Sequence, residues 1–228
     1  MQGLKDELFD LLQAKGARLM GVVDLKGIAG GALTTGVSVA VPVPKEIVRD
    51  LQTAPTLAYY EAYHSLNAQL NQIVSAGAAL LQERGFHAVA NTTDTVKTDE
   101  NWRSPLPHKT VAVHAGLGWI GKNCLLITER YGGAVRLSSL LTDAPLPFDA
   151  PVEKSRCGGC RVCVERCPAR AFTGATWTPG IEREKLFDWK RCYPEQLRQM
   201  KQATGIETDL CGLCFAVCPY TQRYLREE

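Results

Sequence analysis

The chain has 228 residues, and its 26 basic and 24 acidic side chains leave a formal net charge of +2. This balance excludes a global field that would draw the protein to nucleic acid or to a membrane surface, and no apolar run approaches the ~18 residues of a membrane span. The N-terminal segment MQGLKDELFDLLQAKG is charged throughout and lacks the apolar core of a secretory signal. We therefore expect a cytoplasmic protein, in which nine cysteines indicate metal before disulfides.

The beginning of the chain predicts a helix followed by two strands. Apolar residues at 4–12 form a helical stripe that Gly16 can end. Residues 19–23 have the pattern of a short buried strand. Residues 37–43 alternate and are rich in β-branched side chains, which predicts a second strand.

The next stretch predicts the longest helix of the chain. Residues 57–84 keep an apolar face in helical register, with Gly85 available as the C-cap, and a third strand is expected at 87–90. Residues 91–106 are polar, contain Pro105 with Pro107 directly after them, and show no period. They predict a loop that covers a site.

A domain boundary is predicted near residue 148. Residues 124–128 and 134–141 indicate two strands joined by a turn at 129–133. The proline-rich stretch TDAPLPFDAPVEK follows them. We therefore predict an α+β protein with an α/β domain at 1–148 and a small second domain at 149–228.

The second domain contains a dense cysteine pattern. One run has the spacing Cys-x2-Cys-x2-Cys-x3-Cys-Pro of bacterial ferredoxins, in which three thiolates bind one 4Fe-4S cluster and the fourth binds a second cluster. A second run repeats the end of this spacing. The two runs are Cys157, Cys160, Cys163 and Cys167 with Pro168, and Cys211, Cys214 and Cys218 with Pro219.

The second run lacks its first cysteine, because Thr208 stands at that position. Cys192 is the only unassigned cysteine in this domain and is therefore the natural replacement. The predicted ligands are Cys157, Cys160, Cys163 and Cys218 for cluster 1, and Cys167, Cys192, Cys211 and Cys214 for cluster 2.

Two other interpretations of the cysteines are less favoured. Zinc sites usually come as two separated pairs, and a triple at i, i+3, i+6 crowds a tetrahedron. Disulfides are disfavoured in a cytosolic chain. Cys124 lies apart from both runs in an apolar segment and is expected to be a small buried hydrophobe.

The segment GLGWIGK matches the pattern G-x-G-x-x-G through Gly116, Gly118 and Gly121. A dinucleotide-binding loop must open a helix, whereas the β-type run CLLIT follows here, so nicotinamide binding is not favoured. Three glycines this close still imply backbone that turns sharply or approaches something flat or bulky. His108 and His114, six residues apart, do not indicate a second metal centre.

In order, the loop AGLGWIGKN, the segment LLTDAPLP and the motifs CGGCRVCVERCPARAF and CGLCFAVCPY resemble the epoxyqueuosine reductase family. The likeness extends from about residue 16 to residue 220. It implies an N-terminal α/β domain of the corrinoid-binding type followed by a ferredoxin-like domain with two 4Fe-4S clusters. By the same resemblance, the residues expected to lie against cobalamin are Gly116, Gly118, Trp119, Gly121, Lys122, Leu126 and Ser138.

The sequence departs from the family in two places. The acidic proton donor of the family falls on Trp102, which cannot act as a general acid, and Asp99 and Glu100 are the nearby candidates for this role. The chain ends at YTQRYLREE, before the helical domain that helps full-length members hold tRNA. We therefore expect the short, stand-alone branch of the family and do not favour tRNA as the substrate.

These observations lead to an expected oxidoreductase that passes electrons from two 4Fe-4S clusters to a bound cobalamin for a corrinoid-dependent reduction. The expected partners are an electron donor such as ferredoxin or flavodoxin and a small-molecule or corrinoid substrate, with no membrane. One alternative is a two-cluster electron carrier or complex subunit without corrinoid. A third is the reduction of epoxyqueuosine in tRNA.

Overall fold

The computed structural model describes residues 2–227, which form two compact units. The predicted domains, 1–148 and 149–228, are each one continuous segment and stay a prediction, whereas each compact unit combines several segments of the chain. The first unit comprises the described residues up to Val41, Ser65–Leu117 and Arg136–Val152, and the second comprises Pro42–His64, Gly118–Val135 and the described residues from Glu153 onward.

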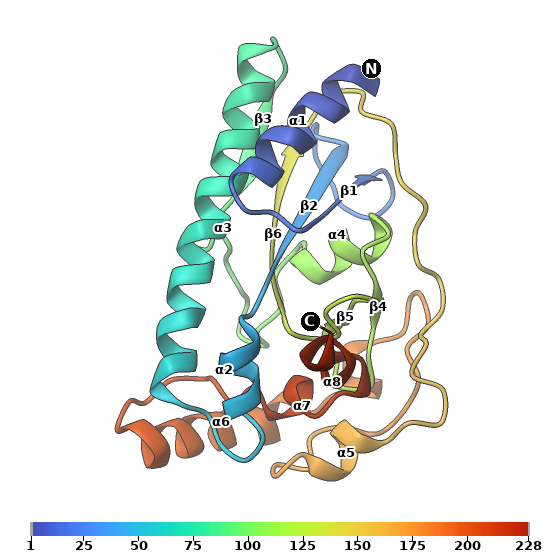
Figure 1. Cartoon of the computed structure of the whole chain (residues 1–228). Helices are drawn as coiled ribbons and strands as arrows, with labels where there is room; N and C mark the ends of the chain where they lie inside the picture. The colour runs from blue at the N-terminus through green and yellow to red at the C-terminus, as the bar shows by residue number, and fades with distance from the viewer. Residues whose placement is uncertain (1, 228) are drawn as a thin grey trace. The chain divides into compact units, whose positions relative to one another are not determined.

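The first unit is built on a four-stranded sheet with the order β1-β2-β6-β3 (Figure 1). Strand β1 (Leu19–Asp24) pairs antiparallel with β2 (Thr35–Pro42). Strand β3 (Ala88–Asn91) pairs antiparallel with β6 (Val135–Thr142). These four strands form the sheet on which the helices of the first unit pack.

Helices cover both faces of this sheet (Figure 1). Helices α1 (Gln2–Ala14) and α3 (Leu57–Glu83) pack on one face, and α4 (His108–His114) packs on the other. Strand β2 is buried on both sides, as expected for a covered strand. Its odd-numbered valines, from Val37 to Val41, join the core formed with α1 and α3.

Most of the elements predicted for the first half of the chain are confirmed. The helix at 4–12 lies in α1, and the strands at 19–23, 37–43 and 87–90 lie in β1, β2 and β3 with shifts of one or two residues at their ends. The long helix α3 ends as predicted before Gly85, which has a left-handed φ of 87°. Residues 92–107 form the predicted loop.

The two strands predicted on either side of the turn at 129–133 are confirmed, but they lie in different sheets. Residues 126–127 form strand β5 (Leu126–Ile127), which pairs with β4 (Trp119–Ile120), whereas the strand predicted at 134–141 is β6 of the large sheet. An isolated antiparallel bridge between Thr128 and Gly132 closes the predicted turn. The alternation of apolar residues identified both strands, but it carried no information about their partners.

The second unit consists mainly of short helices around the β4–β5 hairpin. Helix α6 is its longest; it begins at the N-cap Asp188, whose carboxylate accepts hydrogen bonds from two backbone N–H groups, and it ends at Gly205. No helix among residues 2–227 is long and apolar enough to cross a membrane. The remaining elements are α2 (Lys45–Asp50), α5 (Val162–Arg166), a 3-10 turn (Arg183–Lys185), α6 (Trp189–Thr204), α7 (Leu213–Ala216) and α8 (Pro219–Arg226).

An ion pair between a buried lysine and a partly exposed aspartate fixes the proline-rich segment of the first unit. The ammonium of Lys5 donates to both carboxylate oxygens of Asp149, at 2.8 and 2.9 Å, and to the carbonyl oxygen of Pro147 at 3.0 Å. Asp149 also accepts a 2.8 Å hydrogen bond from the backbone N–H of Val22 in β1. The side chain of Lys5 is only 10% exposed, so its charge depends on this partner.

We predict that Asp149→Ala lowers the free energy of unfolding by about 2–3 kcal/mol, because it leaves the Lys5 ammonium buried without its counter-ion. Denaturant titration of the anaerobic protein measures this change. Glu7→Ala is the control, since Glu7 and Arg84 form a half-exposed pair that contributes less than about 1 kcal/mol. Equal effects of the two substitutions would contradict the prediction.

Candidate iron–sulfur site

The thiols of one group of cysteines lie close together in the second unit. Cys163 interacts electrostatically with Cys218, Cys157 and Cys160, and Cys218 in turn interacts with Cys157 and Cys160. The spacing of the first run places three of these residues on one loop, and Cys218 comes from the turn before α8. This group has the composition predicted for cluster 1.

A second group forms around α6 and α7. Cys192 interacts with Cys167 and Cys211, and Cys214 interacts with all three of these cysteines and with Cys163 of the first group. Cys167, Cys192 and Cys214 also pack in one apolar cluster with Phe172. This group has the composition predicted for cluster 2, including the remote Cys192.

Burial dominates the proton affinity of these thiols. Burial, and after it the neighbouring cysteines, raises the pKa of Cys163 and of Cys192 to about 12. Burial also raises the pKa of Cys214 well above its ordinary value. Metal-free thiols in such surroundings keep their protons at neutral pH, so a metal that binds them as thiolates has to displace those protons.

The two groups fit the ligand requirement of two 4Fe-4S clusters. Each cluster takes four thiolates, each group supplies four, and all nine cysteines of the chain are free of disulfide bonds. Within residues 2–227, no three His, Cys, Asp or Glu side chains converge on a single metal ion. A cuboidal cluster spreads its four thiolates further apart than one ion does, because its own iron and sulfide atoms fill the centre.

Backbone N–H groups point at the sulfur atoms of both groups. The N–H of Ala171 donates to Sγ of Cys167 at 3.5 Å. Backbone N–H groups of Thr221 and Tyr220 lower the pKa of Cys218, although burial outweighs them. Such N–H···S hydrogen bonds stabilise thiolate charge and are one of the features that set cluster potentials.

The β4–β5 hairpin is fixed to the backbone of the cysteine loops. The ammonium of Lys122, at the tip of the hairpin, donates to the carbonyl oxygens of Gly158 at 2.8 Å and Cys160 at 3.0 Å. The next residue, Asn123, donates from Nδ2 to the carbonyl oxygen of Cys214 at 3.3 Å. Both side chains are buried. One hairpin therefore holds the loops that supply both cysteine groups.

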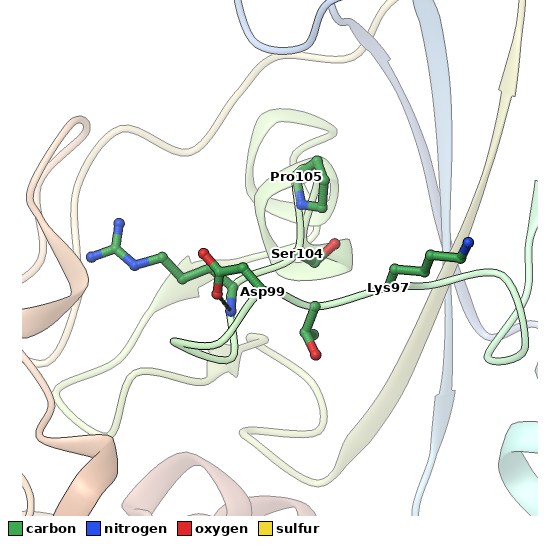
Figure 2. Close-up of a pocket in the computed structure, with 6 residues that line it drawn as sticks. Lys97, Asp99, Ser104 and Pro105 are labelled. Carbon is green, nitrogen blue, oxygen red and sulfur yellow. Dashed lines mark hydrogen bonds between the residues drawn. The ribbon is translucent and has the colours of Figure 1, made fainter.

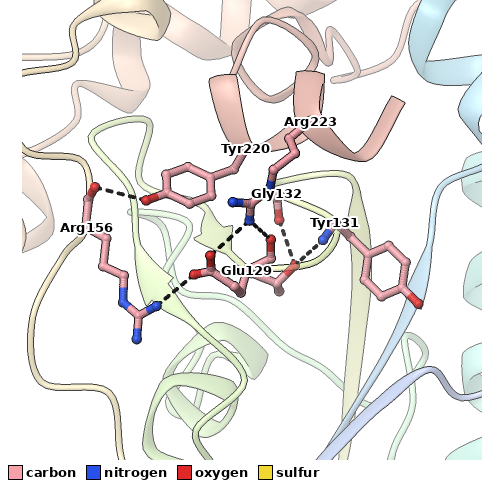
Figure 3. A network of polar contacts seen from close by, with 7 residues as sticks. Glu129, Tyr131, Gly132, Arg156, Tyr220 and Arg223 are labelled. Atoms are coloured by element: carbon pink, nitrogen blue, oxygen red, sulfur yellow. Dashed lines mark hydrogen bonds and ion pairs between the residues drawn. The ribbon is translucent and has the colours of Figure 1, made fainter. Parts of the chain in front are cut away.

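A polar network joins the two ends of the first group (Figure 3). The carboxylate of Glu129 accepts hydrogen bonds from Arg156, which precedes Cys157, and from Arg223 of α8. The hydrogen bond from Arg223 holds the pKa of Glu129 below its ordinary value. Tyr220 lies between them and donates to the carbonyl oxygen of Arg156 at 3.4 Å. No local sequence pattern predicts this network, because its members are far apart along the chain.

The residues expected to lie against cobalamin are mostly enclosed by protein. Gly116 is exposed, whereas the other six are buried. Ser138 donates to the carbonyl oxygen of Asn91 at 3.1 Å, and Lys122 is bound to the cysteine loop. Trp119 is 1% exposed, and its indole Nε1 has no hydrogen-bond partner among the described residues. These side chains are therefore used in contacts within the protein, and contact of the backbone around them with cobalamin stays a prediction.

Contacts within the protein account for the glycines of this loop. A Cβ on Gly116 would lie 2.6 Å from the carbonyl oxygen of Ala150, and one on Gly118 would lie 2.1 Å from that of Ile127. Gly116 also has a left-handed φ of 79°. Close approach of backbone, which the spacing predicted, is therefore present, and the approaching atoms belong to the chain itself.

The predicted acidic candidates lie on the loop before α4, beside an open cavity of about 350 Å³ (Figure 2). Asp99 lines this cavity together with Lys97 and Arg103. Its Oδ1 accepts hydrogen bonds from the backbone N–H groups of Asn101 and Arg103, at 2.8 and 2.9 Å. Glu100 is exposed and does not line the cavity. A catalytic role for either carboxylate stays a prediction.

Two histidines and one cysteine of interest lie elsewhere. His108, at the start of α4, has Nδ1 3.0 Å from the hydroxyl of Ser139. Burial, and after it the positive charge of Arg136, lowers the pKa of His108 from 6.5 to about 4. Cys124 is buried as expected, with a left-handed φ of 59° in the β4–β5 turn. His114 ends α4.

Comparison with protein families confirms the pair of clusters. Residues 156–221 match the family described as "4Fe-4S double cluster binding domain". The second domain is therefore a double-cluster 4Fe-4S domain, in agreement with the predicted fold class.

Comparison with individual proteins confirms the resemblance to epoxyqueuosine reductases. A protein of that name from Pseudomonas aeruginosa is 30% identical over 163 residues, which are 70% of this chain and 41% of that protein. Another from Bacillus cereus is 37% identical over 119 residues, or 50% of this chain and 29% of that protein. The chain thus spans less than half the length of these relatives.

Two solved structures share the fold. An epoxyqueuosine reductase in complex with an epoxyqueuosine-modified tRNA stem loop has a TM-score of 0.63 and 19% identity, covering 96% of this chain and 66% of that chain. A catabolic reductive dehalogenase in complex with 3-bromo-4-hydroxybenzoic acid has a TM-score of 0.68 and 18% identity, covering 94% and 31%. At this identity, the likeness concerns the fold.

The ligand groups predict that Cys192→Ala removes one cluster and keeps the other. Iron analysis of the anaerobically reconstituted protein is expected to fall from about eight to about four irons per chain, because Cys192 completes only the second group. Cys124→Ala, which removes a thiol outside both groups, is expected to keep about eight. Full iron content in Cys192→Ala would refute the assignment.

The environment of His108 predicts a loss of stability in mild acid. Because the pKa is about 4 in the folded chain and 6.5 in its ordinary state, the unfolded chain takes up the proton first as pH falls. The free energy of unfolding therefore decreases between about pH 6.5 and pH 4, by up to roughly 3 kcal/mol from this group.

His108→Gln removes the titrating group and keeps a polar side chain. Denaturant titrations between pH 7 and pH 4 are expected to show a flatter pH dependence in this variant. His87→Gln, at a histidine outside this site, is the matched control and should keep the wild-type slope. The same slope in His108→Gln and wild type would contradict a buried neutral His108.

Proposed function

We propose that this chain is a cytoplasmic iron–sulfur redox protein that passes electrons from two 4Fe-4S clusters to a bound cobalamin for a corrinoid-dependent reduction. The observation that carries the redox part is the division of eight cysteines into two groups of four within the matched double-cluster domain. Cys214 of the second group interacts electrostatically with Cys163 of the first, and this proximity supports electron exchange between the clusters.

The corrinoid part is supported by the fold. The chain shares its fold with epoxyqueuosine reductase and with a reductive dehalogenase whose published structure "suggests a mechanism for B12-dependent dehalogenation", at a TM-score of 0.67 and 19% identity. A bound cobalamin would supply a cobalt centre that accepts electrons and reduces the substrate. The residues of this chain hold the clusters, fix the hairpin to them and exclude water from the thiols.

A second function is favoured by the packing of the glycine loop. Gly118, Trp119 and Lys122 are enclosed by protein, as expected for a two-cluster electron carrier or complex subunit that binds no corrinoid. In this case an external donor such as ferredoxin or flavodoxin delivers electrons, and a partner protein receives them. The two proposals share the clusters and differ only in the acceptor.

A third function follows from the names of the relatives, which are epoxyqueuosine reductases. The reduction of epoxyqueuosine in tRNA would require a tRNA stem loop to bind this chain. Such binding would weaken steeply with salt. Its absence at low salt would remove this function from consideration.

We predict that the anaerobically reconstituted protein binds cob(II)alamin stoichiometrically. EPR titration is expected to convert the signal of free cobalamin into that of a bound form with its base detached. The matched control is the same titration with Cys192→Ala, which should keep the cobalt signal because Cys192 belongs to a cluster group. Spectra of free cobalamin throughout would leave the two-cluster electron carrier.

A further inference from the structure

Lys122 brings a positive charge to the loop that supplies the first cysteine group. Its ammonium donates to the carbonyl oxygens of Gly158 and Cys160, at 2.8 and 3.0 Å. Gly158 follows Cys157, and Cys160 is itself a member of the group. The contact thus places the ammonium directly against the backbone that holds two of the four thiols.

The surroundings keep this charge from being screened. Lys122 as a whole is 5% exposed, although it is a residue type that is rarely buried. Neither of its hydrogen-bond acceptors carries a formal charge, and no ion pair of Lys122 with a carboxylate occurs in the part of the chain described. Its field therefore acts on the neighbouring thiolates instead of being cancelled by an acidic side chain.

We propose that Lys122 raises the reduction potential of cluster 1, the cluster bound by Cys157, Cys160, Cys163 and Cys218. Reduction adds one electron to the cluster, and no bond forms or breaks. A cation buried beside the cluster stabilises the more negative, reduced form, and net charge is one of the features that set cluster potentials. Lys122 acts through the cluster and is a positioning residue, not a catalytic one.

The inference rests on the double-cluster domain and not on cobalamin. It also assigns the effect of Lys122 to one cluster alone. The acidic groups that act on Cys192 of cluster 2 are Asp209 and Glu195, of which Glu195 is paired with Arg198. Among the described residues, no lysine ammonium is hydrogen-bonded to the backbone of the cluster 2 cysteines, so Lys122 shifts the potential of cluster 1 and not that of cluster 2.

The test is a redox titration of the anaerobic two-cluster protein, followed by EPR, with dithionite as reductant. Lys122→Gln removes the charge and keeps a hydrogen-bond donor. The midpoint potential of cluster 1 is expected to fall by about 59 mV. For one electron this equals about a tenfold decrease in the ratio of reduced to oxidised cluster at a fixed potential. The midpoint of cluster 2 should stay unchanged, and the signal that remains in Cys192→Ala identifies cluster 1.

Two further variants separate charge from structure. Lys122→Arg keeps the charge and is expected to restore the wild-type midpoint. Lys154→Gln removes an exposed lysine three residues before Cys157 and is expected to change the midpoint little, because solvent screens that charge.

Two outcomes would overturn the proposal. One is an unchanged midpoint of cluster 1 in a Lys122→Gln protein that holds about eight irons. The other is loss of cluster 1 from Lys122→Gln with retention in Lys122→Arg and no midpoint to compare, which would make Lys122 a structural clamp. Failure of cobalamin to bind would affect neither measurement.

Discussion

The need to gather eight thiols from separate segments into two groups dominates the second unit. Each group borrows a member from the other run: Cys218 joins the first run, and Cys167 joins the group around Cys192. This exchange ties the loop at 157–167 to the chain from 192 to 218, which includes most of α6 and all of α7. Two bound clusters would therefore cross-link these segments, because each cluster would take thiolates from both.

The sequence predicted those features that a local pattern encodes. The helical stripe of α1, the β-branched alternation of β2 and the ferredoxin spacing each involve residues that are close together in the sequence. The absence of a cysteine at Thr208 was enough to indicate Cys192 as the remaining ligand. The Val-Ala-Val triplet before the glycine loop can pass for a strand but lies in α4, where Val111 packs against β1. Tertiary packing there overrides a weak β preference.

Features that depend on long-range contacts were out of reach. The sheet partners of β5 and β6 could not be predicted, and the contribution of residues 42–64 and 118–135 to the second unit was not foreseen. These stretches join it through contacts such as the edge-on packing of Tyr59 on Phe215 and of Trp119 on Tyr220. No periodicity reports such pairs, because the two partners are about 100 residues or more apart in the sequence.

Lys122 shows how a residue carried over by resemblance acquires its meaning from its contacts. The resemblance predicted a position against cobalamin, whereas the hydrogen bonds of the side chain are to the loop that supplies the first cysteine group. Asn123 extends the same hairpin to Cys214 of the other group. Because the hairpin is anchored at both groups, its conformation depends on the cysteine loops being in place. These contacts couple the position of the hairpin to that of the loops that supply both cysteine groups.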